Sequence, residues 1–423
     1  MNIVIIGNGI AGNHVAFTLR HLNYPCDITI ISAEKFPEYD PCSLPYFISG
    51  EVTRDVIFRK NIDDYKKNNI NLILDNKAIS IDSKSKKAIT EKGNEFKYDK
   101  IILAYGGNLF IPEIKGINKK GVFSCKQLFE ADKLNSHKGK TAVVIGSGAI
   151  GIEAAEALKR KGYNVFIIEL LDWILPTMFD EPAARLLEKA LNNYGISIFT
   201  GEKVISIEGR TNVTGITTDK RKIPCDTVVI ATGVVLDKSL AESAGVQTGR
   251  AILVNKKMET NVKNIYACGD CAETPDAFST ENCNFQLKHN AIEQADIIAK
   301  NISDYDVNYT GAYPFARAHF FKTYASSFGK TMKQVKEKND ITIIEKEKNT
   351  DYLRVILKSG KVIGAQAIGK YADNMGLLLS AMWQQNDINE LRNNWQKVLQ
   401  LDSPYPWTYR KLGYLLGFGQ LVI

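Results

Sequence analysis

A short run of apolar residues opens the chain at residues 3–6 and leads into a glycine-rich turn. Apolar residues then recur at helical spacing over about residues 13–22, and a second apolar run covers residues 28–31 and ends near Glu34. Short runs without polar alternation are typical of strands buried on both faces of a parallel sheet. The pattern therefore predicts a β-α-β unit at the start of the chain.

The same order of elements returns about 139 residues later. Residues 142–145 predict a strand, a helix continues through Glu153 to Gly162, and residues 165–168 predict the next strand. Each unit is followed by a hydrophobic strand that ends in small residues, at 98–107 and 226–233. The repeat predicts two nucleotide-binding folds of the α/β class.

The remaining patterns place further elements around these units. Residues 52–98 contain short alternating runs, at 72–74, 78–81 and 87–90, which predict an antiparallel excursion. Residues 288–302 predict an amphipathic helix, and strand-like runs beyond residue 310 are followed by helices. We therefore expect a discontinuous first domain (1–110 and 245–310), a second domain (111–244) and a C-terminal α+β domain (311–423).

The two turns carry the residues that dinucleotide binding requires. In Gly7-Asn8-Gly9-Ile10-Ala11-Gly12, the first glycine makes the turn, the second lets the backbone approach a pyrophosphate, and the third lets helix and strand pack closely. Glu34 follows Gly12 by 22 residues, the distance at which an acid binds ribose hydroxyls. The second turn is Gly146-Ser147-Gly148-Ala149-Ile150-Gly151, with Glu169 following by 18 residues. An acid there without a nearby arginine favours NADH over NADPH.

Composition and charge indicate which classes of function the sequence does not support. Hydrophobic residues make up 44% of the chain and charged residues 24%, as in ordinary globular proteins. A net charge of +7 without a polybasic block gives no argument for nucleic acid. Seven scattered cysteines indicate a reducing compartment, and neither a signal peptide nor a run of about 18 apolar residues is seen. We expect a cytoplasmic protein without a membrane span.

Two cysteine patterns suggest chemistry. Cys42 lies where a turn runs into an apolar segment, and a helix N-terminus there would favour the thiolate, although a buried inert thiol is the alternative. Cys268-Gly269-Asp270-Cys271 invites a redox or metal interpretation. No second pair follows at zinc-site spacing, so coincidence is favoured and no metal site is predicted.

The ordered motifs resemble those of the FAD/NAD-linked pyridine nucleotide-disulfide oxidoreductases. The resemblance implies two Rossmann-like domains, arranged as in glutathione reductase, and a C-terminal domain that forms a homodimer. It assigns the following residues to FAD: Gly7, Gly9, Ile10, Ala11, Gly12, Glu34, Ala104, Gly106, Gly269 and Asp270. It assigns the following residues to NAD: Gly146, Gly148, Ala149, Ile150, Gly151, Glu169 and Gly233. Tyr105 departs from the family's Ala-Thr-Gly junction.

Cys42-Ser43-Leu44-Pro45-Tyr46 is similar to the motif of the family's single-cysteine branch, which includes coenzyme A disulfide reductases, NADH oxidases, NADH peroxidases and persulfide reductases. The oxidases and peroxidases resemble one another in a histidine inside the first glycine loop. Ile10 takes that position here, and His14 lies one helical turn further on. This difference favours a small disulfide or persulfide as acceptor over oxygen or peroxide.

The resemblance also implies roles in catalysis. Glu153 would lie near the nicotinamide of NADH, and Cys42 would pass electrons from FAD to the acceptor. Residues implied as substrate contacts are Ser43, His14, Thr18, Arg20 and Tyr405. Three alternatives remain open: an NADH oxidase producing peroxide or water, a reductase of a protein carrier such as rubredoxin or ferredoxin, and a non-catalytic redox sensor.

Overall fold

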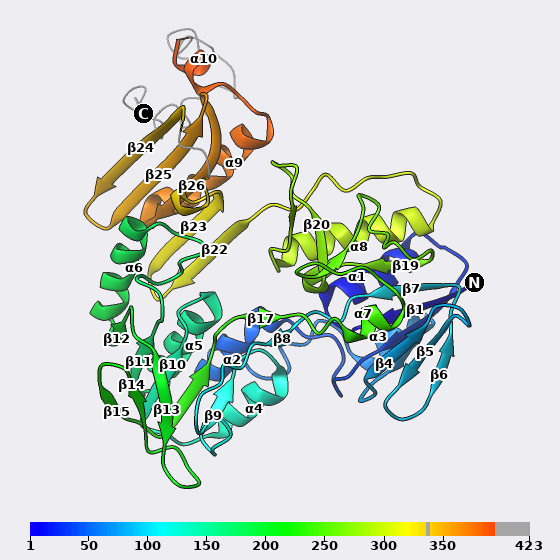
Figure 1. Ribbon diagram of the computed structural model, residues 1–423, viewed down its shortest axis with the longest axis horizontal. Coiled ribbons are helices and arrows are strands. Elements are labelled where there is room, and N and C mark those ends of the chain that lie inside the picture. The colour runs from blue at the N-terminus through cyan, green and yellow to red at the C-terminus, as the bar shows by residue number, and fades with distance from the viewer. Residues whose placement is uncertain (336–338, 394–423) are drawn as a thin grey trace. The chain divides into compact units, whose positions relative to one another are not determined.

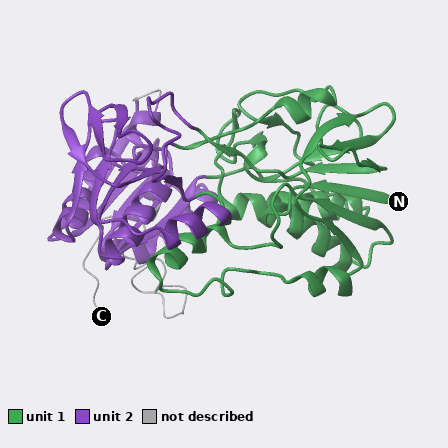
Figure 2. Ribbon diagram, turned by 90° about the horizontal axis from the view of Figure 1, so that it is seen from below, with its two compact units in different colours: residues 1–110, 126–128, 233–313 green, residues 111–125, 129–232, 314–423 purple. Residues whose placement is uncertain are grey.

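The computed structural model describes residues 1–335 and 339–393, which form two compact units (Figures 1 and 2). The first unit contains residues 1–110, 126–128 and 233–313, and the second contains residues 111–125, 129–232 and the described residues from 314 to 393. Residues 233–244, which the sequence assigns to the second nucleotide-binding domain, thus group with the first unit. There β17 (Val234–Val235) pairs with β8 (Asn108–Leu109).

A five-stranded parallel sheet forms the centre of the first unit, and its strand order is β19-β7-β1-β2-β3. The strands are β1 (Asn2–Ile6), β2 (Asp27–Ile31), β3 (Ile70–Ile73), β7 (Lys100–Leu103) and β19 (Ile265–Ala267). Helix α1 (Ile10–His21) packs against helix α8 (Lys288–Ile302). The parallel order brings the carboxyl ends of these strands to one edge, where open α/β sheets bind their ligands.

Three elements of the first unit, one strand and two helices, have predicted positions in the sequence. The predicted helix at 288–302 is confirmed as α8. Helix α1 begins at Ile10 rather than at residue 13, because Gly9 is its N-cap. The strand expected at 72–74 was wrongly assigned to an antiparallel excursion, since β3 pairs in parallel with β2. The antiparallel sheet consists of β4 (Ala78–Asp82), β5 (Lys87–Thr90) and β6 (Glu95–Lys97).

Smaller elements complete the first unit. They are α2 (Leu44–Ser49), α3 (Ile62–Lys67), α7 (Ser239–Ser243), β18 (Ile252–Leu253), β20 (Ala272–Pro275) and β21 (Asn282–Cys283).

The second unit contains a parallel sheet of its own with the order β12-β11-β10-β16-β9. Its strands are β9 (Val122–Ser124), β10 (Thr141–Ile145), β11 (Asn164–Ile168), β12 (Ile196–Phe199) and β16 (Thr227–Ile230). Helices and a small antiparallel sheet accompany it: α4 (Leu128–Ser136), α5 (Ala149–Arg160), α6 (Glu181–Asn193), β13 (Val204–Glu208), β14 (Gly215–Thr218) and β15 (Lys222–Pro224). The second predicted β-α-β unit is thus present as β10-α5-β11.

An antiparallel sheet follows in the same unit, with the order β22-β23-β26-β25-β24. Its elements are β22 (Phe315–Phe320), β23 (Thr323–Gly329), β24 (Ile341–Lys348), β25 (Asp351–Lys358), β26 (Lys361–Ile368), α9 (Met375–Trp383) and α10 (Ile388–Asn393). Asp180, the N-cap of α6, ties this sheet to that helix, because its carboxylate accepts hydrogen bonds from Gln366 Nε2 (2.8 Å) and the Met332 N–H (3.0 Å). Nowhere in the described ranges is a helix long and apolar enough to cross a membrane.

Candidate active site

The first glycine loop has the shape that a dinucleotide needs. A Cβ added to Gly12 would lie 2.1 Å from the Gly7 carbonyl oxygen, so only glycine lets α1 pack this closely on the loop. Around Gly9, by contrast, a Cβ would meet no atom within 4 Å, and Gly9 caps α1 without a side-chain hydrogen bond. Ile10 and Ala11 form the first turn of α1. The open loop and a helix N-terminus without a side-chain cap hydrogen bond fit the pyrophosphate of FAD.

The strand-end junction at residues 104–106 packs directly on this loop. Gly7 has a φ of 114°, and a Cβ there would lie 2.2 Å from the Ala104 carbonyl oxygen. Gly106 also has a positive φ, of 69°. Tyr105, where the family has threonine, donates a hydrogen bond of 3.0 Å to the Asp237 carbonyl. The tyrosine is therefore accommodated by a contact of its own, and the close packing of Gly7 on Ala104 is kept.

Two acids and one lysine lie at this end of the first sheet. The Glu34 carboxylate accepts hydrogen bonds from the Tyr39 hydroxyl at 2.8 and 3.1 Å. Burial raises the pKa of Glu34 and of Asp270, and the positive charge of Lys126 opposes both shifts. The positive charge of Lys126 thus acts on both acids predicted to contact FAD.

Cys42 lies in a short 3₁₀ turn, Pro41–Ser43, immediately before α2. Its side chain is exposed, so the expectation of a buried thiol is wrong, while the reactivity of the thiol stays a prediction. Asp40 caps the turn, because its carboxylate accepts a hydrogen bond of 3.2 Å from the Cys42 N–H. Helix α2 has only six residues, so we expect neighbouring charges to influence this thiol more than a helix dipole.

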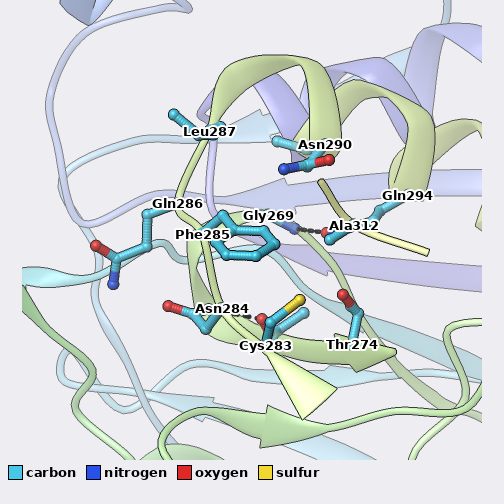
Figure 3. Close-up of a pocket in the computed structure, with 12 residues that line it drawn as sticks. Gly269, Thr274, Cys283, Asn284, Phe285, Gln286, Leu287, Asn290, Gln294 and Ala312 are labelled. Carbon is cyan, nitrogen blue, oxygen red and sulfur yellow. Dashed lines mark hydrogen bonds between the residues drawn. The ribbon is translucent and has the colours of Figure 1, made fainter. Parts of the chain in front are cut away.

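A small pocket lies beside the turn that carries Asp270 (Figure 3). The Gly269 N–H donates a hydrogen bond of 2.8 Å to Gln294 Oε1 (Figure 3). Asn284 Nδ2 donates to the Asp270 carbonyl at 2.9 Å. The bond to Gln294 holds the Gly269–Asp270 turn against α8, and the bond from Asn284 joins the turn to the segment before that helix. Cys42 does not line this pocket, so we expect the acceptor to reach the exposed thiol from solvent.

The second glycine loop repeats the geometry of the first. A Cβ on Gly151 would lie 2.1 Å from the Gly146 carbonyl oxygen, whereas one on Gly148 would meet nothing within 4 Å. Gly148 caps α5 without a side-chain hydrogen bond, and Ala149 and Ile150 follow in its first turn. The loop leaves room for a second pyrophosphate.

Glu169 is buried beneath the second loop rather than extended into solvent. One carboxylate oxygen accepts from the Ser147 N–H (2.8 Å) and the Ser147 hydroxyl (2.5 Å), and the other accepts from the Leu171 N–H (2.9 Å). The acid therefore orders the loop while it places a negative charge beneath it. Gly233, at the end of the strand-end segment, has a φ of 101°.

Glu153 lies on α5, one turn before Glu156. Burial, and then the charge of Glu156, raises the pKa of Glu153 to about 7. Glu156 itself accepts hydrogen bonds from Arg160 Nη2 (2.8 Å) and the Phe321 N–H (2.8 Å). A carboxyl group that titrates near neutral pH is suited to a reaction in which charge develops beside it.

Cys268 and Cys271 lie in the core of the first unit. Both thiols are buried, and burial raises the pKa of Cys271 to about 12 and that of Cys268 well above its usual value. Cys271 Sγ donates to the carbonyls of Leu103 and Cys268, both at 3.2 Å. Among the described residues there is neither a disulfide nor a cluster of three metal-ligating side chains.

The residues implied as substrate contacts are dispersed. His14 Nε2 lies 4.0 Å from Asp296, and burial lowers the pKa of His14. Arg20 donates to the carbonyls of Asn68 (2.7 Å), Asn69 (2.8 Å) and Cys26 (2.9 Å), so its guanidinium supports the main chain. Ser43 follows Cys42 in the turn and Thr18 is partly buried on α1, while Tyr405 falls beyond the described ranges. Contact of these residues with a substrate remains a prediction.

Four residues of the site were missed from the sequence. Asp40, Arg59 and Lys288 form an ion-pair cluster next to Cys42, and the positive charge of Lys126 acts on Glu34 and Asp270. Asp40 lies two residues before Cys42, but its contacts with Arg59 and Lys288 join distant parts of the chain, so no fixed spacing marks the cluster.

Comparison with known proteins gives a consistent result. Residues 1–295 match the family model described as pyridine nucleotide-disulphide oxidoreductase. An NADH oxidase of Methanocaldococcus jannaschii is 31% identical, with 93% of each chain covered. A coenzyme A polysulfide/persulfide reductase of Pyrococcus horikoshii is 30% identical, covering 80% of this chain and 78% of the relative.

A solved structure, the NAD-dependent persulfide reductase of A. fulgidus, superposes with a TM-score of 0.87 and 30% identity, covering 93% of this chain and 79% of that one. The predicted α/β fold and oxidoreductase class are confirmed by these matches. The chain belongs to the pyridine nucleotide-disulphide oxidoreductase family.

Proposed function

We propose that this protein is an FAD-dependent NADH oxidoreductase that reduces a small disulfide or persulfide, such as coenzyme A disulfide, through Cys42. The observation that carries the proposal is an exposed cysteine held in a capped turn, within the same compact unit as the first dinucleotide loop. The names of the persulfide reductases at 30% identity support the same acceptor class.

The residues of the first unit would hold FAD, which supplies two-electron transfer between NADH and a thiol when bound. The open loop at Gly9 and the first turn of α1 would receive its pyrophosphate. Glu34 would bind ribose hydroxyls and Asp270 the ribityl chain. Lys126 would supply positive charge to the same ligand.

The second loop would bind NADH. Gly148 leaves room for the pyrophosphate, and the charge of Glu169 would repel the 2′-phosphate of NADPH. Glu153 would lie beside the nicotinamide, where its ionised form stabilises the positive charge that develops as hydride departs.

At Cys42 the thiolate would attack one sulfur of the acceptor disulfide. A bond forms between Cys42 and that sulfur, the acceptor S–S bond breaks, and the first thiolate leaves. Two electrons from NADH, with one proton, then cleave the mixed disulfide, release the second thiol and restore the Cys42 thiolate. The exposure of Cys42 allows an external disulfide to approach, since nucleophilic attack on a disulfide requires access.

NADH oxidase activity is the second candidate, because a relative at 31% identity carries that name. In that reaction Cys42 would cycle through a sulfenic acid.

We also propose that the protein is cytoplasmic and that it forms a homodimer through residues 311–423. Sedimentation of the purified protein would test the homodimer.

The test is alkylation of the NADH-reduced enzyme with iodoacetamide. We expect modification of Cys42 and loss of coenzyme A disulfide reduction to proceed at the same rate, while reduction of the flavin by NADH continues. Parallel measurements of oxygen consumption and peroxide separate the oxidase. Full disulfide turnover in Cys42→Ser would overturn the proposal.

A further inference from the structure

The carboxylate of Asp40 joins three separate parts of the first unit. Oδ1 accepts the Cys42 N–H at 3.2 Å, and Oδ2 contacts Arg59 Nη2 at 2.8 Å and Lys288 Nζ at 2.7 Å. Lys288 is the first residue of α8, and Arg59 lies in the loop before α3. One side chain thus connects the turn that carries Cys42 to the helix that braces the Gly269–Asp270 turn.

The backbone on both sides of Asp40 is fixed as well. The Asp40 N–H donates to the Ile57 carbonyl at 2.8 Å, and the Arg59 N–H donates to the Glu38 carbonyl at 2.9 Å. The Glu38 carboxylate is buried and contacts Lys60 Nζ at 2.9 Å. The segments 38–40 and 57–60 therefore form one braced pair, and Asp40 and Arg59 cannot easily move apart.

The charges near Cys42 do not balance. Asp40 contributes one negative charge, and Arg59 and Lys288 contribute two positive charges. Burial raises the pKa of Asp40, but hydrogen bonds from Lys288 and Arg59 bring this pKa below its usual value. The carboxylate is therefore ionised at neutral pH. Asp40 raises the pKa of Arg59, and the nearby Cys42 thiolate adds a smaller contribution in the same direction. Glu38 also raises the pKa of Arg59, but its ion-pair partner Lys60 balances its charge, so the excess of one positive charge remains.

We propose that Asp40 is a positioning residue that, together with Arg59 and Lys288, holds the Cys42 turn and sets the charge around its thiol. Asp40 offsets part of the positive charge, so the net effect of the cluster favours the thiolate without the full attraction of two cations. This inference rests on the proposed role of Cys42 as the redox thiol. It assigns the tuning of that thiol to a cluster outside the glycine and cysteine motifs.

The test is the pH dependence of Cys42 alkylation in the purified holoenzyme, followed by peptide mass spectrometry. In Asp40→Asn the amide oxygen can still cap the turn, but both cations lose their counter-charge, so the apparent pKa of Cys42 should fall. In Arg59→Met and Lys288→Met one cation is removed, so the pKa should rise. A unit charge several ångströms away in a partly solvated site shifts a pKa by about half to one pH unit.

Shifts of opposite sign in the pKa of Cys42 distinguish an electrostatic effect of the cluster from loosening of the turn. Loosening would shift this pKa in the same direction in all the variants. Lys84→Met, an exposed cation in the turn between β4 and β5, is the matched control and should leave the pKa unchanged. Shifts of the same sign in Asp40→Asn and Arg59→Met, or no shift in either, would overturn the inference. Failure of the proposed function would look different, because Cys42→Ser would then keep its disulfide turnover whatever the pKa values.

Discussion

The Tyr39 hydroxyl lies 2.8 Å from one carboxylate oxygen of Glu34 and 3.1 Å from the other. The same hydroxyl accepts a hydrogen bond of 3.2 Å from the Leu128 N–H. Tyr39 therefore braces the acid predicted to bind the FAD ribose and stands three residues before Cys42. The predicted cofactor site and the thiol are linked through one short segment.

Replacing Tyr39 with phenylalanine should weaken this link. The change removes a hydrogen bond to a carboxylate and leaves the buried Leu128 N–H without its acceptor, at a cost of about 1–3 kcal/mol. We expect flavin to be released at a lower temperature, as followed by flavin fluorescence. Tyr98→Phe is the control, since its buried hydroxyl has no hydrogen-bond partner within the described ranges. Equal release temperatures for the two variants would argue against the brace.

The two glycines of the first loop should respond differently to alanine. Gly12→Ala places a Cβ 2.1 Å from the Gly7 carbonyl, so the helix must shift and both the melting temperature and the flavin content should fall. Gly9→Ala meets no protein atom within 4 Å, so the fold should persist while the flavin content falls. Absorbance and thermal melting of the purified variants measure both quantities. Full flavin content in Gly9→Ala would contradict a pyrophosphate at this position.

Glu169 should control the choice between NADH and NADPH. Glu169→Gln removes the negative charge but keeps an acceptor for the Ser147 hydroxyl. We expect the ratio of kcat/KM for NADH to that for NADPH to fall about tenfold, which corresponds to roughly 1.4 kcal/mol of relieved repulsion. Asp172→Asn, an exposed acid three residues further on, is the control. An unchanged ratio in Glu169→Gln would show that Glu169 does not determine the preference for NADH over NADPH.

The pKa of Glu153, raised to about 7, predicts a pH dependence of the hydride step. Below that pH the carboxyl is neutral, and above it the carboxylate favours the nicotinamide cation, so flavin reduction by NADH should accelerate as the pH rises through about 7. Stopped-flow rates in Glu153→Gln should lack this rise. In Glu156→Gln the midpoint should move to lower pH, because a negative charge that raises the pKa is lost. A rise that survives unchanged in Glu153→Gln would assign it to another group.

Both nucleotide loops could be predicted from the sequence because their physics is local. Gly7 and Gly12 contact each other within one turn, and the flanking strands are continuous apolar runs. The start of α1 was misplaced because the helix begins inside the glycine motif, where no amphipathic pattern marks it. Strand β3 was misassigned because it lies at an edge of the parallel sheet, where only Ile70 of its four residues is buried and the apolar signal is weak.

The surroundings of Cys42 could not be predicted in the same way. The Asp40–Lys288 contact joins residues that are 248 positions apart, and no spacing rule connects them. At Tyr105 the sequence shows the departure from the family pattern, but it does not show the hydrogen bond that the tyrosine donates to the distant Asp237 carbonyl. Motifs identify the reaction class, whereas the charges that tune the thiol depend on the folded structure.

An anaerobic NADH titration after treatment with coenzyme A disulfide tests the central claim most directly. Removal of excess disulfide should leave wild-type protein with a mixed disulfide at Cys42. Such protein should consume two equivalents of NADH per flavin, one to cleave the mixed disulfide and one to reduce the flavin, with release of one thiol. Cys42→Ser should consume one equivalent and release no thiol. One equivalent in the wild type, or two in Cys42→Ser, would contradict the assignment of Cys42 as the redox thiol.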